Sequence, residues 1–102
     1  MKLARVTGTV EASVKDPSLT GAKLLLTDLV DGAGEVLVKA FVAVDACGAG
    51  VGDQVLVTFN SAARMPSSAA GAATDATIIA VVDRVTMADA KPAIPARKKR
   101  KT

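Results

Sequence analysis

The side chains best able to do chemistry gather in one short glycine-rich stretch, from Asp45 to Asp53, which reads DACGAGVGD. It combines two carboxylates with Cys47, the one cysteine of the chain. A thiol beside carboxylates suggests a nucleophile or a metal ligand, but both roles usually need a histidine or further soft ligands nearby. The sequence has no histidine. This excludes histidine-based acid–base catalysis, Ser–His and Cys–His nucleophiles, and ordinary zinc sites.

Three glycines, Gly48, Gly50 and Gly52, occupy alternate positions in the same stretch. Their spacing fits neither the dinucleotide-binding fingerprint nor the phosphate-binding loop, because no strand-to-helix pattern follows and no Gly-Lys-Ser/Thr occurs. Carboxylates at the ends of predicted strands more often close turns than react, and this group comprises Asp45, Asp53, Asp75 and Asp83. We therefore predict that the chain is not an enzyme and holds no cofactor or metal.

The glycine-rich stretch is flanked by two runs of alternating apolar residues, the pattern of half-buried strands. Residues Phe41 to Phe59 therefore predict a β-hairpin with the glycines at its tip. One interpretation of the tip is a bulged turn. The other is a loop that packs closely against copies of itself or lines an opening, since glycine lets another backbone approach. Asp53 is expected to fix the turn by bonding nearby amides, and Cys47 to be a small core residue.

Period-two patterns run through most of the chain and predict five strands. Their expected ranges are Leu3–Val14, Lys23–Asp31, Val36–Val44, a run ending at Phe59, and Ala76–Val85. Gly8 suggests a bend or bulge in the first strand, and Asn60 or Ser61 is expected to cap a short helical turn that reaches Met65. The predicted fold is all-β, a small five-stranded OB-like β-barrel with one short helical turn.

A chain of 102 residues allows one domain. A domain of this size buries only about 60 to 65% of its unfolded surface, so association with other copies would stabilise it. Both faces of Lys23–Asp31 carry leucine, and a second buried face is what a subunit interface requires. Arg64 has two interpretations: a solvated surface residue, or a salt-bridge partner for an acidic residue of a neighbouring subunit.

The cellular location is inferred from what the sequence leaves out. No uninterrupted apolar run approaches the length of a membrane-spanning helix, and the first residues begin a strand pattern without a signal-peptide core. A single cysteine cannot form an internal disulfide, which agrees with a reducing compartment. We expect a cytoplasmic protein without membrane contact.

Three segments, in order, carry a resemblance to a known family. The first comprises Gly8-Thr9-Val10 and Lys15-Asp16-Pro17-Ser18-Leu19-x-Gly21-x-Lys23-Leu24-Leu25-Leu26. The central one comprises Val44-Asp45, Gly48-Ala49-Gly50-x-Gly52-Asp53-x-Val55-Leu56-Val57 and Ser61-Ala62-Ala63-Arg64. The last is Asp75-Ala76-x-Ile78-Ile79-Ala80-Val81-Val82-Asp83-x-Val85. Over residues 1 to about 86, the chain resembles the vertex proteins of bacterial microcompartment shells, the ethanolamine-utilisation and carboxysome (EutN/CcmL) family.

The resemblance implies a structural protein found in the bacterial microcompartment shell. Such a barrel forms a cyclic homopentamer and caps the five-fold vertices, next to hexameric and pseudohexameric shell proteins. The residues then expected at a subunit interface or pore loop are Gly48, Ala49, Gly50, Val51, Gly52, Asp53 and Arg64. A ring of five Cys47 thiols around a metal or cluster is an alternative role for that residue, but the sequence supplies no companion ligand.

The end of the chain differs in character from the rest. Residues 1–90 hold 7 basic and 10 acidic residues, whereas residues 91–102 hold 6 basic and no acidic ones. Prolines, alanines and a charge run cannot build a core, so we predict a barrel domain over 1–88 and a disordered tail over 89–102. The tail is either a solubilising extension or an electrostatic tether to acidic cargo, a negatively charged shell face or nucleic acid. Its charge lies in Arg97, Lys98, Lys99, Arg100 and Lys101.

An OB-like nucleic-acid-binding or adaptor domain with a basic tail is the alternative function. Such domains stack bases on exposed aromatic side chains in a positively charged groove. Here the part before the tail is net acidic, and its two aromatic residues, Phe41 and Phe59, fall at positions expected to be buried. Nucleic acid is therefore not an expected partner of the barrel.

Overall fold

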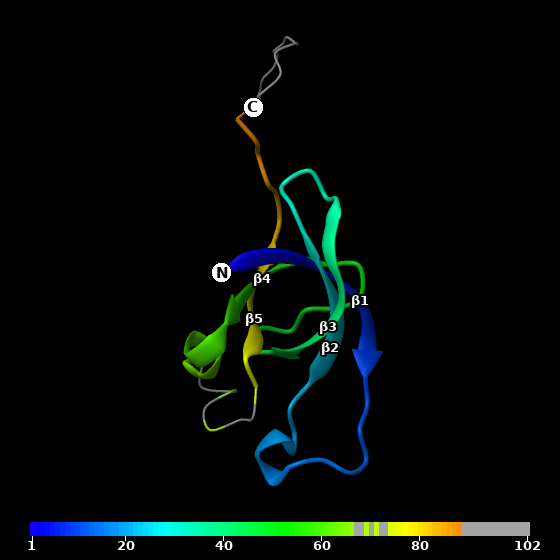
Figure 1. The fold of residues 1–102 in the computed structure, drawn as a ribbon, viewed down its shortest axis with the longest axis vertical. Helices are drawn as coiled ribbons and strands as arrows, with labels where there is room; N and C mark the ends of the chain where they lie inside the picture. Colours follow the sequence, from blue (N-terminus) through cyan, green and yellow to red (C-terminus); the bar gives the residue numbers. More distant parts are fainter. Residues whose placement is uncertain (67–68, 70, 72–73, 89–102) are drawn as a thin grey trace.

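The computed structural model describes residues 1–66, 69, 71 and 74–88. The elements of this part are β1 (Lys2–Val10), η1 (Pro17–Leu19), β2 (Leu24–Val30), β3 (Val36–Asp45), β4 (Gln54–Phe59), η2 (Asn60–Arg64) and β5 (Ala76–Val82), where η marks a short 3-10 turn. The strands close into a barrel in the order β1-β2-β3-β5-β4 (Figure 1). The prediction of an all-β, five-stranded barrel is confirmed, although the described elements include two short helical turns, η1 and η2, where one was expected.

The predicted hairpin from Phe41 to Phe59 is wrong, because β3 and β4 are not neighbours in the sheet. β5 lies between them, antiparallel to β4 over its whole length and parallel to β3 at two residue pairs. The connection from β3 to β4 therefore passes β5 instead of turning back tightly. Alternation cannot reveal this, because it reports which face of a strand is buried and not which strand lies beside it.

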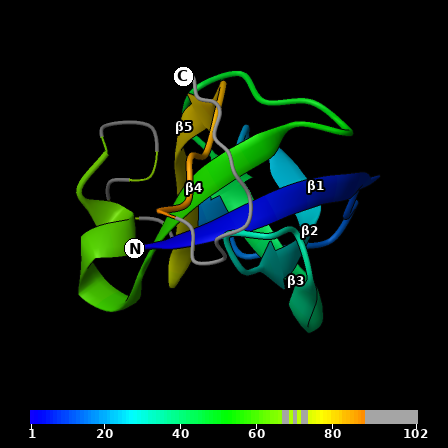
Figure 2. The same cartoon turned by 90° about the horizontal axis from the view of Figure 1, so that it is seen from above.

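Aliphatic side chains fill the barrel interior, as expected for a barrel of this size. The buried core comprises Ala4, Val6, Leu25, Ala43, Ala49, Val55, Val57, Ala76 and Ile78. Figure 2, seen from above, shows the strands arranged around this centre. Phe41 and Phe59 pack against the core with ring centroids 5.8 Å apart, but both stay partly exposed. The expectation that both are buried is therefore met only in part.

β1 and β5 end earlier than the alternation predicts. β1 stops at Val10, which pairs with Leu24, the first residue of β2. Beyond that point β2 offers no partner, and Val14 is 93% exposed. β5 likewise stops at Val82, opposite Gln54, the first residue of β4. In both cases the strand ends opposite the first residue of its antiparallel neighbour.

The two faces of β2 differ in burial. Leu25 points into the barrel and is buried, whereas Leu24 and Leu26 lie on the outside and are half-buried. The register of β1 against β2 shifts between Val6 and Gly8, so the predicted bulge is confirmed. The outer leucines thus remain available for contact with another molecule.

The helical turn after β4 starts differently from the prediction. Phe59, and not Asn60 or Ser61, occupies the cap position of η2, and it makes no side-chain capping hydrogen bond. Asn60 instead adopts a left-handed conformation with φ of 59°, which asparagine tolerates better than most residues. Backbone geometry, and not a side-chain cap, therefore begins this turn.

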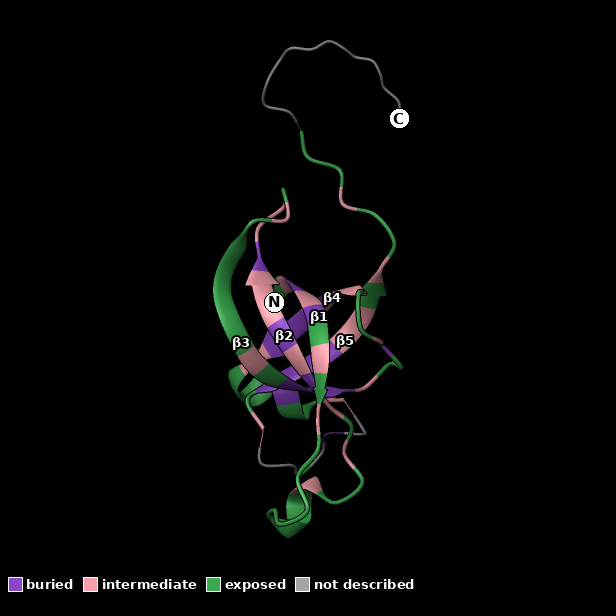
Figure 3. Cartoon of the chain, turned by 90° about the vertical axis from the view of Figure 1, so that its right-hand side faces the viewer, coloured by how far each residue is buried: buried purple, intermediate pink, exposed green. Residues whose placement is uncertain are grey.

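β3 is buried at one end only. The five residues Val36 to Ala40 are exposed, whereas Ala43 to Asp45 are buried. Figure 3 shows the exposed part of β3 on the outer surface of the barrel. β3 thus presents a long outer surface that its own chain does not cover.

Part of the chain lies outside the residues described. This applies to the predicted tail, residues 89–102, so the boundary at residue 88 stays a prediction. Among the described residues, no helix has the length and apolar character needed to span a bilayer.

Candidate functional site

The glycine-rich connection between β3 and β4 is held at both ends by backbone hydrogen bonds. Near its start, the Ala46 amide donates to the Ile78 carbonyl at 3.1 Å. Near its end, the Gly52 amide donates to the Val6 carbonyl and the Val6 amide donates to the Asp53 carbonyl, both at 2.9 Å. The connection is therefore fixed to β5 at one end and to β1 at the other.

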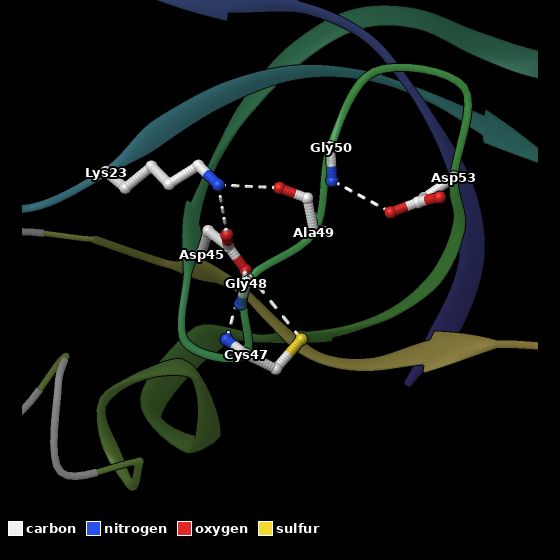
Figure 4. A network of polar contacts seen from close by, with 7 residues as sticks. All are labelled: Lys23, Asp45, Cys47, Gly48, Ala49, Gly50 and Asp53. Atoms are coloured by element: carbon white, nitrogen blue, oxygen red, sulfur yellow. Dashed lines mark hydrogen bonds and ion pairs between the residues drawn. The ribbon is translucent and has the colours of Figure 1, made fainter.

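The carboxylate of Asp45, the last residue of β3, organises the start of this connection (Figure 4). The side chain is fully buried. Its Oδ1 accepts hydrogen bonds from the amides of Cys47 at 3.0 Å and Gly48 at 3.1 Å. Its Oδ2 lies 3.1 Å from Nζ of Lys23 but accepts no hydrogen bond within the described part of the chain, so this contact is an ion pair without hydrogen-bond geometry.

Lys23 joins the start of β2 to the middle of the connection. Its Nζ donates to the Ala49 carbonyl at 2.6 Å, besides pairing with Asp45. The Asp45 amide donates to the Lys23 carbonyl at 2.8 Å, so backbone and side chains link the same two residues. The lysine side chain stays 52% exposed and keeps part of its hydration while it neutralises the buried carboxylate. We call Lys23 and Asp45, with the backbone groups that they bind, the Lys23–Asp45 clamp.

The clamp shifts the pKa values of its carboxylate and of the neighbouring thiol. Burial raises the pKa of Asp45, but the Cys47 amide and the Lys23 ammonium outweigh burial, and the resulting pKa is below its usual value. Burial, together with the charge of Asp45, raises the pKa of the Cys47 thiol. At neutral pH Asp45 is therefore ionised and Cys47 protonated. This pair of states suits an ion pair and not a nucleophile.

Two of the three glycines are required by backbone conformation. Gly48 and Gly52 have φ of +83° and +95°, a region that side chains disfavour. No heavy atom of the chain lies within 4 Å of a Cβ built on either residue. Gly50 is not in that region, but its amide donates to Oδ2 of Asp53 at 2.8 Å. The predicted role of Asp53 in fixing the turn is therefore confirmed.

The side chains of this connection alternate between the core and solvent. Ala49 is buried and belongs to the core, whereas Val51 is 64% exposed. Cys47 is also exposed, so the prediction of a small core residue is wrong at this position. Cys47 lies two residues beyond the end of β3, where the chain has left the core, and Ala49 fills the core instead.

Arg64 lies apart from the glycine-rich connection, in a groove of about 450 Å³. Its guanidinium donates to the Thr74 carbonyl at 3.1 Å and is exposed to solvent. The groove is lined by Leu19, Leu24, Val42, Val44, Arg64, Thr74 and Asp75. No residue of the glycine-rich connection is among them, so one subunit does not bring Arg64 and the glycines together.

A second groove, of about 380 Å³, continues the first, because Val42 and Asp75 line both. Its other lining residues are Lys2, Leu29, Val38, Phe41, Phe59 and Ala76. β3 contributes two exposed apolar side chains to these grooves, Val38 at 50% and Val42 at 44% exposed. We call the two grooves together the β3 groove. A continuous apolar surface of this kind marks an interaction site more often than scattered exposed residues do.

Sequence reasoning missed Lys23 and the β3 groove. The pairing of Lys23 with Asp45 depends on the barrel bringing the start of β2 beside the end of β3, and nothing local to either residue signals it. Leucine on both faces of β2 was the one usable signal for the groove, since Leu24 lies in it.

The described residues do not bring together the side chains of a metal site. No three His, Cys, Asp or Glu side chains come together there in a way that could hold a metal ion. Cys47 contacts one carboxylate, with its Sγ 3.7 Å from Oδ1 of Asp45. The polar groups at this site therefore hold backbone in place.

The fold and the site together define a small closed β-barrel with a rigid glycine-rich connection and an uncovered apolar groove, the make-up of a protein that associates with others. Residues 1–83 match the family described as ethanolamine utilisation protein EutN/carboxysome, and the chain belongs to this family. It is 45% identical over 87 residues to the bacterial microcompartment shell vertex protein PduN of Salmonella typhimurium, covering 81% of this chain and 96% of the relative.

Solved structures agree with the family assignment. The structure of CcmL from Gloeobacter violaceus superposes with a TM-score of 0.80 at 41% identity, covering 86% of this chain and 91% of that one. GrpN, a pentameric microcompartment shell protein from Rhodospirillum rubrum, superposes with a TM-score of 0.77 at 34% identity, covering 85% and 99%. The similarity therefore extends over nearly the whole of each relative and confirms the family that the three sequence segments indicated.

Proposed function

We propose that this protein is a structural component of a bacterial microcompartment shell, where it forms a cyclic pentamer and caps the five-fold vertices. The observation that carries this proposal is the match of the entire barrel, and not of an isolated motif, to shell vertex proteins. The clamp supports it as well, because a plug needs rigid loops, and the polar groups of this loop hold the backbone. A nucleic-acid-binding role is disfavoured, since Phe41 and Phe59 pack on the core.

The β3 groove supplies one half of the subunit interface in this proposal. A ring is built from heterologous contacts, in which one side of each subunit meets the opposite side of the next. Leu24, Val38 and Val42 form the apolar half, and Arg64 supplies a charge in the same groove. Arg64 then pairs with a carboxylate of the neighbouring copy, where a bidentate contact is favoured.

The glycine-rich connection is the other part of the proposed contact surface. The space next to Gly48 and Gly52 is empty in one subunit, and Val51 projects into solvent. Residues 48–53 therefore line the opening of the ring or meet the next subunit. Hexameric shell proteins are the proposed neighbours at the rim of the pentamer. The protein has no catalytic role in this proposal.

The direct test is the oligomeric state of the full chain. Native mass spectrometry at micromolar concentration is expected to show a pentamer, and co-expression with hexameric shell proteins is expected to give closed shells by electron microscopy. A dominant monomer or two-fold dimer would contradict the proposed pentameric ring. Closed shells that exclude the protein from their corners would refute the vertex role even if the ring forms.

A further inference from the structure

The second groove, of about 380 Å³, is built like a site for an extended segment. β3 pairs with β2 along most of its length but with β5 at only two residue pairs, at its far end. Val38 and Val42, which precede those pairs, line the groove. Phe41 and Phe59 line it as well, with ring centroids 5.8 Å apart, and both are partly exposed. Aromatic-lined grooves and open strand edges are surfaces that bind extended peptides.

The chain itself contains a segment with matching chemistry, Pro92-Ala93-Ile94-Pro95. Two prolines spaced three residues apart favour the polyproline II conformation, which has three residues per turn and places both prolines on one side. Segments of this pattern bind aromatic-lined grooves, because they lose little conformational entropy on binding. Ile94 is the only large apolar residue between positions 89 and 102. The segment therefore combines two prolines with one apolar anchor.

The charges around the groove agree with this segment. Arg97 follows Pro95 by two residues, and Asp75 supplies a carboxylate to the lining of the groove. Arginine and carboxylate groups form strong, often bidentate, hydrogen-bonded pairs. The first groove also contains Asp75, but no aromatic ring lines it among the described residues. The second groove is therefore the better match.

The segment can reach this groove from its own barrel. After β5 the chain passes to the turn that joins β2 and β3, where the Met87 sulfur lies 3.4 Å from the position that a Cβ on Gly32 would occupy (Figure 1). Val38 is the third residue of β3 after this turn, about 7 Å along the strand from its start. The six residues from Ala88 to Ile94 span up to about 20 Å. The available length thus exceeds the length needed.

We propose that residues 91–97 dock in the second groove of their own subunit before the ring forms, and that the neighbouring subunit displaces them on assembly. The proposal rests on the pentamer proposed above, in which the same groove is part of the subunit contact. A short tether keeps the segment at a local concentration of about a millimolar, which favours the subunit's own groove over that of another copy.

Docking of this kind competes with assembly. The docked segment covers apolar surface on a separated subunit, and it raises the protein concentration at which rings form, because only undocked subunits can associate. In the complete ring the neighbouring subunit fills the groove. The size and the Tm of the ring therefore do not depend on the segment.

The direct test is a disulfide between segment and groove in the full chain. Val38→Cys and Ile94→Cys are combined with Cys47→Ser, which removes the native thiol, and the protein is oxidised at a concentration too low for rings. We expect an intramolecular disulfide on non-reducing gels, a locked chain that stays monomeric by native mass spectrometry, and pentamers after reduction. The control pairs Ile94→Cys with Val81→Cys, on a side chain that is 41% exposed and outside the groove. Its disulfide should form at least about tenfold more slowly, because the two thiols are not held together.

The second test uses unlocked protein. In Ile94→Ser, half-maximal ring formation on dilution is expected at a protein concentration at least about threefold lower than in the parent, because the docked state is lost. Lys98→Gln/Lys99→Gln changes the same extension outside residues 91–97 and should leave this concentration unchanged.

Four outcomes would overturn the proposal. Disulfides between subunits would place the segment in the groove of another copy. Equal rates for the two cysteine pairs would show that the segment does not dock. A locked chain that still forms pentamers, or an unchanged midpoint in Ile94→Ser, would show that docking does not compete with assembly. A parent that stays monomeric at micromolar concentration would instead refute the ring, and the intramolecular disulfide reports docking separately.

Discussion

Asp45 illustrates how one buried charge can anchor a turn. Its carboxylate has lost its water, but two amides and the Lys23 ammonium compensate for that loss. The same contacts connect the end of β3, the start of β2 and the connection that follows. A single side chain therefore determines the shape of the surface that we propose for assembly.

Replacing Asp45 by alanine is expected to lower the free energy of unfolding by about 1 to 3 kcal/mol, because the Cys47 and Gly48 amides lose their acceptor. For a domain of this size, each kcal/mol lowers Tm by roughly 4 to 8 °C. Thermal unfolding followed by circular dichroism measures the change. The control is Glu11→Ala, which removes an exposed carboxylate and should alter stability by less than about 0.5 kcal/mol. Equal losses in the two variants would contradict the anchoring role.

The lowered pKa of Asp45 also predicts how stability depends on pH. A depressed pKa in the folded state stabilises the fold above the unfolded pKa, and this contribution is lost as pH falls through the folded value. The difference in Tm between the parent and Asp45→Asn should therefore be constant from neutral pH down to about pH 5, and should shrink below the usual carboxylate range, near pH 4. A Tm difference that grows on acidification would contradict a lowered pKa of Asp45 in the folded state.

The glycines allow conformation and contact to be tested separately. Gly52→Val forces a β-branched residue into φ of +95° and is expected to destabilise the fold by more than about 1 kcal/mol. Gly50→Val avoids that strain, and the nearest atom to its Cβ is Oδ2 of Asp53 at 3.9 Å. Gly50→Val is therefore expected to keep the Tm of the separated subunit and to weaken the pentamer. Normal pentamers in both variants would make the connection an ordinary turn.

At the scale of the strands, the sequence patterns predicted where the strands lie but not which strands pair with each other. Alternation located all five strands, and Gly8 correctly indicated the bulge in β1. It misplaced strand ends at Val14 and Val85, because each strand ends opposite the first residue of an antiparallel partner, and that partner is remote in sequence. It also joined β3 to β4 in a hairpin, since the inserted β5 is encoded after both.

The same limit applies to the candidate site. Asp53 could be predicted because its partner is three residues away, whereas Lys23 could not, because its partners meet it only after the barrel closes. The β3 groove also combines residues from distant elements, such as Leu24, Val42 and Asp75. Local signals thus predicted the local parts of the site.

The β3 groove makes its own prediction about assembly. Val42→Asp places a charge in the groove at a side chain that is 44% exposed, so the barrel should tolerate it while the subunit contact should not. Native mass spectrometry is expected to show loss of the pentamer with little change in circular dichroism. The matched control, Val14→Asp, changes a residue that is 93% exposed and lies outside the groove, and it should leave the ring intact. A pentamer that survives Val42→Asp would place the interface elsewhere.

At the scale of the whole molecule, the barrel and the basic extension are expected to be independent. Every described strand lies within residues 2–82, so deletion of residues 91–102 should leave Tm and oligomer size nearly unchanged. Differential scanning calorimetry and native mass spectrometry measure these quantities. Dissociation of the ring on deletion would mean that the extension belongs to the subunit interface, and the boundary at residue 88 would be wrong.

The position of β5 has a consequence for the time at which the protein can fold. β5 closes the barrel between β3 and β4, yet it is the last strand to leave the ribosome. Until then β1 to β4 can form only an open sheet, with β3 and β4 at its uncovered edges, and such edges are prone to pair with the wrong chain. Closure also joins segments far apart in sequence, a feature of slow folding. Ring assembly must therefore wait for the end of synthesis, and the interval before closure is when aggregation competes with the fold.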